Sequence, residues 1–195
     1  MKNAREPTYS FVILTLILIV IDTILAWASV SVTPTVAGGT VSWLFFAVAF
    51  MILFTLWFGW YGAIAAYVGT LVGSGLMVSE VLNQHPLVAV VWAVGGLFQV
   101  LIPLAAVRSF GVNLSMENPR DYTYILLFGV VINNLIGAAW AAWTLSLIEP
   151  GEMMTVFSAW FIGNAVVCLF IVPIGLKLFT PKMEKNRLFI RNYWD

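Results

Sequence analysis

The feature that most constrains this chain is an uncharged, mostly apolar run from Tyr122 to Ile148. An α-helix rises ~1.5 Å per residue, so about 20 residues cross the ~30 Å hydrocarbon core of a bilayer. The rest of the chain has the same character, because 62% of its 195 residues are hydrophobic and only 9% are charged. Soluble domains carry about 25% charged residues. We therefore expect an all-α integral membrane protein.

Six apolar segments divide the chain, and each predicts one transmembrane helix. The apolar sequence from 41 to 78 is about twice as long as one crossing, and the aromatic and glycine residues from Trp57 to Gly62 suit a turn at the membrane interface. We expect a single domain over residues 1–195 with a short basic tail at 177–195. The predicted spans are approximately residues 9–32, 41–58, 60–79, 87–107, 122–147 and 154–176.

The charged residues separate cleanly under this six-span topology. The charged side chains of the loops opposite the termini are all acidic, namely Glu80, Glu149 and Glu152. The side of the termini carries all nine basic residues, which are Lys2, Arg5, Arg108, Arg120, Lys177, Lys182, Lys185, Arg187 and Arg191. The positive-inside rule then predicts that both termini are cytoplasmic, in a plasma or inner membrane. The basic tail is interpreted as facing lipid headgroups, or alternatively as docking a cytoplasmic partner.

Amide and tryptophan side chains recur on the same helical faces of three predicted spans. A buried amide is costly unless it finds a hydrogen-bond partner, and ligand sites are mainly apolar with a few placed polar groups. We interpret the pattern as a pocket open to the outer side that binds a small, mostly uncharged or aromatic molecule, with Glu80 and His85 near its mouth. The predicted ligand-binding residues are Trp92, Gln99, Asn133, Asn134, Trp140, Trp160 and Asn164.

A simpler interpretation of the same residues stays open. Tryptophans form belts at membrane interfaces. Amides can bridge neighbouring helices at ~0.6 kcal/mol each. Under this alternative the chain is a structural subunit or scaffold of a larger membrane complex and binds no ligand.

Asp22 is the only acidic residue in the middle of a predicted span. An intramembrane carboxylate is a candidate functional group, so Asp22 is a possible proton or cation site and the centre of a coupled carrier. A structural role, with the neutral carboxyl bonded to a neighbouring amide, is the alternative.

The third predicted span carries a stripe of small residues that suits close helix packing, within the chain or against a partner. The stripe is Gly62, Ala66, Gly69 and Gly73.

Enzymatic chemistry has little support in the sequence. The only histidine, His85, lies in a loop, so no intramembrane histidine could activate Ser74 as a nucleophile. No zinc motif or phosphate-binding loop with a lysine occurs, and we expect no metal and no cofactor. A net charge of zero gives no reason to expect nucleic acid as a partner. We therefore predict a protein that is not an enzyme.

Two membrane families share short motifs with the chain. The segment Phe58-Gly59-Trp60-Tyr61-Gly62-Ala63, followed by Gly69 and Gly73, resembles the first half of the membrane-associated sensor (MASE-type) domains that precede kinases and cyclases. The segment Trp160-Phe161-Ile162-Gly163-Asn164, followed by Pro173, is similar to the last span of that family. This resemblance implies a sensor-like domain.

The same turn at 58–63, together with the size and the six predicted spans, resembles the S-components of energy-coupling-factor vitamin transporters. Those proteins present a substrate pocket on the outer side. This second resemblance implies a substrate-capture subunit that acts with separate membrane or cytoplasmic partner proteins.

Overall fold

The computed structural model describes residues 9–189, and helices make up 78% of them. The elements are α1 (Tyr9–Val32), β1 (Thr35–Val36), β2 (Val41–Ser42), α2 (Ala47–Phe58), α3 (Trp60–Gly69), η1 (Thr70–Leu76), α4 (Glu80–Gln84), α5 (Pro86–Phe110), α6 (Pro119–Leu126), η2 (Leu127–Ile132), α7 (Asn133–Ser146) and α8 (Met153–Met183). The segments η1 and η2 are π-helical and continue their neighbours without a break. The chain from 119 to 146 is therefore one long helix.

Four helices are long and apolar enough to cross a membrane, namely α1, α5, the continuous helix 119–146 and α8. The prediction of an all-α fold is confirmed, and these four helices support its place in a membrane by their length and composition. The other two predicted spans correspond to shorter segments. Helix α2 has 12 residues, which is ~18 Å of helix, and α3 continues through η1 to residue 76.

Residues 41–46, predicted as the start of the second span, are not helical. Val41 and Ser42 form β2, which pairs antiparallel with β1 in a short hairpin. Helix α2 begins only at Ala47, whose backbone N–H donates to Ser29 Oγ of α1 at 3.1 Å. The hydroxyl of another helix therefore satisfies an N–H group that the first turn of α2 leaves free.

The break between α2 and α3 falls at Gly59, inside the aromatic and glycine run that predicted it. Gly59 has φ +62° and ψ −132°, a backbone conformation that residues with a Cβ rarely adopt. Gly62 then allows α3 to lie directly against α2, because a Cβ at this position would come within 2.5 Å of the backbone of Phe54. The two short helices therefore form a tight helical hairpin.

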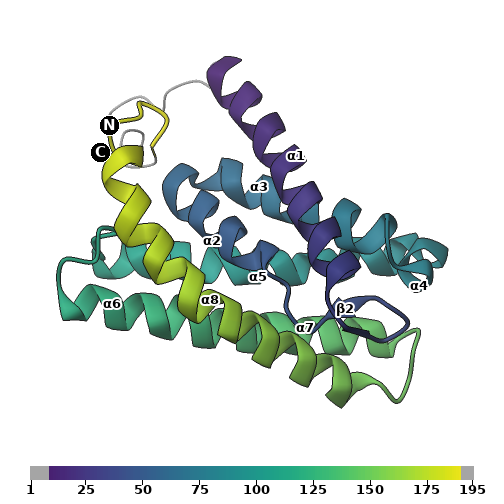
Figure 1. Ribbon diagram of the computed structural model, residues 1–195. Coiled ribbons are helices and arrows are strands. Elements are labelled where there is room, and N and C mark those ends of the chain that lie inside the picture. The colour runs from purple at the N-terminus through teal and green to yellow at the C-terminus, as the bar shows by residue number, and fades with distance from the viewer. Residues whose placement is uncertain (1–8, 190–195) are drawn as a thin grey trace.

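The helices form one bundle in which α5 and the 119–146 helix lie side by side and α8 crosses them (Figure 1). Helix α1 packs across α3 and η1, and α2 packs against α3, α5 and α8. The α2–α3 turn, the α5–α6 connection and the end of α8 lie toward the left of Figure 1, and the start of α1 lies at the top. The β-hairpin, α4 and the α7–α8 connection lie toward the lower right.

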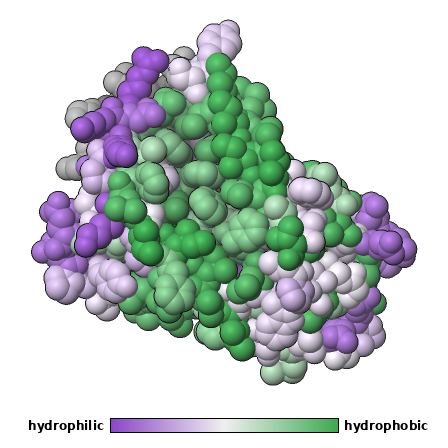
Figure 2. Space-filling model, viewed as in Figure 1, coloured by the Kyte–Doolittle hydropathy of each residue, from purple (hydrophilic) through white to green (hydrophobic). Residues whose placement is uncertain are grey.

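An apolar band covers the surface between two hydrophilic ends (Figure 2). Helix α1 contributes a continuous exposed stripe to the apolar surface, with Val12, Ile13, Leu16, Ile17 and Val20 each more than half exposed. Such a surface is unusual in a soluble monomer. It is the surface expected of a helix that faces lipid.

The small residues of α3 and η1 are used for contacts within the chain. A Cβ on Gly69 would lie 2.6 Å from Asp22 Cβ, and a Cβ on Gly73 would overlap the carbonyl oxygen of Thr23. Ala66 is fully buried. The stripe therefore lets α1 approach α3 and η1 at backbone distance, as small residues do between membrane helices.

Candidate functional site

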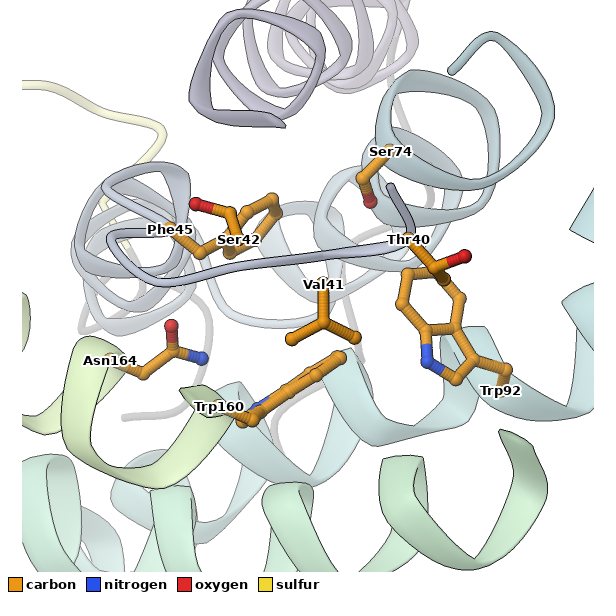
Figure 3. Close-up of a pocket in the computed structure, with 8 residues that line it drawn as sticks. All are labelled: Thr40, Val41, Ser42, Phe45, Ser74, Trp92, Trp160 and Asn164. Atoms are coloured by element: carbon orange, nitrogen blue, oxygen red, sulfur yellow. The ribbon is translucent and has the colours of Figure 1, made fainter. Parts of the chain in front are cut away.

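A small closed pocket lies between the β-hairpin segment and the helices beneath it (Figure 3). Its volume of about 10 Å³ is close to the smallest space that holds a water molecule. The hairpin segment, η1, α5 and α8 each contribute to its wall. The lining residues are Thr40, Val41, Ser42, Phe45, Ser74, Trp92, Trp160 and Asn164.

Three of the lining side chains carry polar atoms without a hydrogen-bond partner among the described residues. They are Trp92 and Trp160, through Nε1, and Asn164, through both Oδ1 and Nδ2. Their exposed fractions are only 1%, 5% and 1%. Burying a polar group without a partner costs about 1–3 kcal/mol, so each instance in a native protein needs an explanation. Three of the six described residues with such groups gather in this pocket, and the other three, Asp22, Thr55 and Asn133, lie elsewhere.

The geometry of these three side chains is defined by two helices. The Trp92 ring of α5 meets the Trp160 ring of α8 edge to face, with centroids 5.5 Å apart and an interplanar angle of 85°. Asn164 follows Trp160 by one helical turn, so both side chains lie on the same face of α8. Figure 3 shows the two indoles and the carboxamide gathered around Val41 of the hairpin.

The hydroxyl groups of the pocket are already engaged. Ser74 Oγ donates to the carbonyl oxygen of Thr70 at 2.8 Å, within its own helix. The hydroxyls of Thr40 and Ser79 bond each other at 2.6 Å. Ser42 Oγ bonds the Thr33 hydroxyl and accepts from the backbone N–H of Leu44. The donors and acceptors left for a bound molecule are therefore those of the two tryptophans and the asparagine.

The β-hairpin closes the pocket through a small number of contacts. Its turn contains Ala37, Gly38 and Gly39, all with positive φ, which is the backbone that tight hairpin turns require. The backbone N–H of Trp43 donates to the carbonyl oxygen of Pro34 at 2.9 Å. The bond between Thr40 and Ser79 ties the hairpin to the segment that caps α4. The cover of the pocket is thus a separate element, held by side-chain hydroxyls and by the burial of Ala37 and Val41 in the core around Trp92 and Trp160.

Gly163 sets the approach of the hairpin segment to α8. A Cβ on this residue would overlap the carbonyl group of Trp43. Because Gly163 lacks one, the chain after β2 lies directly on the turn of α8 that carries Trp160 and Asn164. The glycine next to Asn164 therefore has a steric role in closing the pocket.

The other predicted amide residues bond one another and do not line the pocket. Gln99 Nε2 donates to Asn134 Oδ1 at 2.6 Å, and Asn133 Nδ2 donates to the carbonyl oxygen of Gln99 at 3.1 Å. Asn134 Nδ2 donates to the carbonyl oxygen of Val130 at 2.8 Å. These three amides join α5 to the helix 119–146, although Asn133 Oδ1 has no partner among the described residues.

Trp140, Glu80, His85 and Asp22 also lie outside the pocket lining. Trp140 Nε1 donates to the carbonyl oxygen of Val91 at 2.7 Å on the outer surface of α5. Glu80 and His85 are exposed at the two ends of α4. Asp22 is fully buried against Gly69, and neither of its carboxyl oxygens has a hydrogen-bond partner in the described part of the chain.

The hairpin residues Thr40, Val41, Ser42 and Phe45 were not among the predicted site residues. A signal for them exists, because Gly38 and Gly39 separate two short segments rich in threonine and valine, a pattern typical of a β-hairpin. Within residues 9–189 no group of three histidine, cysteine, aspartate or glutamate side chains could hold a metal ion.

Fold and site together define a class of protein: a helical, membrane-embedded bundle with a small tryptophan- and asparagine-lined pocket closed by a hairpin. No protein-family model, curated protein or solved structure matches the chain.

Proposed function

We propose that the chain is a six-span protein of a plasma or inner membrane with both termini cytoplasmic. The basic connection α5–α6 and the basic end of α8 support this topology because they are in contact: Thr180 Oγ1 donates to the carbonyl oxygen of Leu114 at 3.5 Å. Trp57 Nε1, at the end of α2, donates to the same threonine at 3.0 Å. The helix ends assigned to the cytoplasm thus meet at one end of the bundle. Lys2, Arg5 and Arg191 lie outside the described residues.

We further propose that the protein captures a small, mostly uncharged or aromatic molecule from the outer side. The observation that carries this proposal is the convergence of three unpartnered polar side chains, Trp92, Trp160 and Asn164, in one closed pocket. A ligand would remove the cost of burying these groups, which is ~1–3 kcal/mol each. The matching ligand has acceptor atoms for the two indole N–H groups and an amide-like or hydroxyl group for Asn164.

Capture of such a molecule requires the hairpin to move. The closed pocket has space for about one water molecule. A planar ligand could replace Val41 against the face of Trp160 once the bond between Thr40 and Ser79 opens. The hairpin would then act as the cover of the site, and the helices as its rigid floor.

We propose that the protein captures this molecule as a subunit that resembles an S-component or a sensor domain. It would act with separate partner proteins. The turn at 58–63 and the segment 160–164 support it through their resemblance to those families. Gly163 and Asn164 of the second segment are also the residues that contact the hairpin and face the pocket.

A thermal-shift screen of the detergent-solubilised protein against small uncharged and aromatic molecules tests the capture proposal. We expect at least one compound class to raise the melting temperature of the wild type, and Asn164→Leu to abolish that rise. Asn134→Leu is the matched control, because it removes an amide of the α5–α7 contact and should keep the ligand response. A wild type that no compound stabilises, or a response that survives in Asn164→Leu, contradicts the proposal and favours a scaffold role.

A further inference from the structure

A second hollow lies on the outside of the bundle between α2 and α8, and it shares no residue with the closed pocket. Its volume is about 430 Å³, and its ten lining residues are all apolar or aromatic. Leu53 and Trp57 of α2 form part of one wall, and Phe170, Ile174 and Phe179 of α8 form part of the other. In Figure 2 this region belongs to the apolar surface that borders the hydrophilic end of α8.

The groove is long enough to extend through one leaflet of a bilayer. Its α8 wall runs from Phe170 to Met183, which is ~20 Å of helix, compared with ~15 Å for half of the hydrocarbon core. Gly175 lies at its floor, where a Cβ would come within 2.6 Å of Leu53 Cδ1. The two helices therefore touch at the floor, while the largely exposed rings of Phe170 and Phe179 rise beside it.

One end of the groove is positively charged. Lys182 follows Phe179 by three residues and Gly175 by seven, so it lies on the same helical face as both. Its Nζ atom lies 5.9 Å from the centroid of the Phe179 ring. Trp57, held by its bond to Thr180, lines the groove on the α2 side. A tryptophan and a lysine at the end of an apolar groove are the usual anchors of a membrane interface.

We propose that this groove binds one anionic phospholipid of the surrounding bilayer, with an acyl chain along α8 and the headgroup phosphate at Lys182. The apolar lining suits a hydrocarbon chain and no polar ligand. The charge at the end selects a negative headgroup, because one basic residue near an anionic lipid surface contributes ~1 kcal/mol. The site is separate from the closed pocket and does not depend on it.

Native mass spectrometry of the full-length protein tests this proposal. The protein is exchanged into mixed micelles with equal amounts of palmitoyl-oleoyl phosphatidylglycerol and palmitoyl-oleoyl phosphatidylcholine. We expect the wild type to retain one phosphatidylglycerol in preference to phosphatidylcholine. Lys182→Gln should reduce the preference about fivefold, the factor that corresponds to ~1 kcal/mol. Ile174→Trp, which narrows the groove, should reduce retention of both lipids.

Two control variants lie on α8 outside the groove. Lys177→Gln removes an equal charge about 200° around the helix from Gly175, and Leu169→Trp adds the same bulk at an exposed position that does not line the groove. Both should retain lipid as the wild type does, and the melting temperatures of all variants show whether each one folds. The proposal is overturned by a wild type without headgroup preference, by equal losses in Lys177→Gln and Lys182→Gln, or by a protein dimer that Ile174→Trp disrupts while lipid retention is unchanged.

Discussion

Asn134 and Asn164 have the same side chain but opposite environments. Asn134 accepts from Gln99 Nε2 at 2.6 Å and donates to the carbonyl oxygen of Val130 at 2.8 Å. Asn164 is as deeply buried and has no partner among the described residues. A buried amide with partners stabilises a helix interface, whereas one without partners costs free energy. The difference separates a residue that holds the fold from one whose unpartnered amide we propose to bind a ligand.

Replacing each of these asparagines by leucine, which has a similar size, should therefore change stability in opposite directions. Without ligand, Asn164→Leu should raise the free energy of unfolding by ~1–3 kcal/mol, because it removes an unsatisfied group. Asn134→Leu should lower it by a similar amount, because Gln99 Nε2 loses its acceptor. Thermal unfolding in a single detergent measures both. Destabilisation of equal size in the two variants would show that Asn164 has a structural partner.

The contact between Asp22 and Gly69 allows a second comparison, between the stabilities of two single-residue variants. Its carboxyl oxygens accept no hydrogen bond from the described residues, so Asp22→Asn should unfold at the same temperature as the wild type or at a higher one. Gly69→Ala, by contrast, places a Cβ 2.6 Å from Asp22 Cβ and should lower stability by ~1–3 kcal/mol. If Asp22→Asn is clearly less stable, the carboxyl binds a cation or another group, and the proton- or cation-coupled carrier becomes the better hypothesis.

The β-hairpin and α8 are the two elements that decide whether the pocket is closed. Their contact depends on Gly163, because the carbonyl group of Trp43 occupies the place of a side chain there. The remaining attachment of the hairpin is through hydroxyl pairs such as Thr40 with Ser79 and through the burial of Ala37 and Val41. Because each of its strands has only two residues, we expect the hairpin to open at a lower free energy than a packed helix.

Gly163→Val should push the hairpin away from α8 while the helices stay packed. We expect a cysteine introduced at Val41, buried in the wild type, to react with a maleimide faster in the Gly163→Val background. Cys168 is buried and should contribute little signal. Gly95→Ala is the control, since its Cβ would meet its neighbours at 3.5 Å, an ordinary contact distance. Unchanged labelling of Val41→Cys in Gly163→Val would show that the hairpin does not move as a unit.

For the molecule as a whole, hydrophobic segments were enough to predict the helical membrane class, and the bounds of α1 agree with the predicted span. The sequence does not predict the hairpin at 35–42, because the apolar residues of its second strand continue directly into α2. The two together resemble a single transmembrane span. Helical spacing placed Trp160 and Asn164 on one face, as in the structure. It could not show that Gln99 and Asn134 satisfy each other, because that bond joins residues of two helices and depends on their relative rotation.

The orientation of the whole chain is predicted by its charges and can be tested with single cysteines in exposed connections. Under the six-span topology, Gln84→Cys and Glu152→Cys lie on the outer side, while Glu117→Cys and Lys185→Cys lie in the cytoplasm; all four positions are exposed. In intact cells a membrane-impermeant maleimide should label the first pair strongly and the second pair only after the membrane is permeabilised. Protection of Gln84→Cys together with labelling of Glu117→Cys would reverse the orientation. Labelling of all four, or of only one member of a pair, would contradict the six-span topology, because α5, the helix 119–146 and α8 separate the four positions and each must cross the bilayer once.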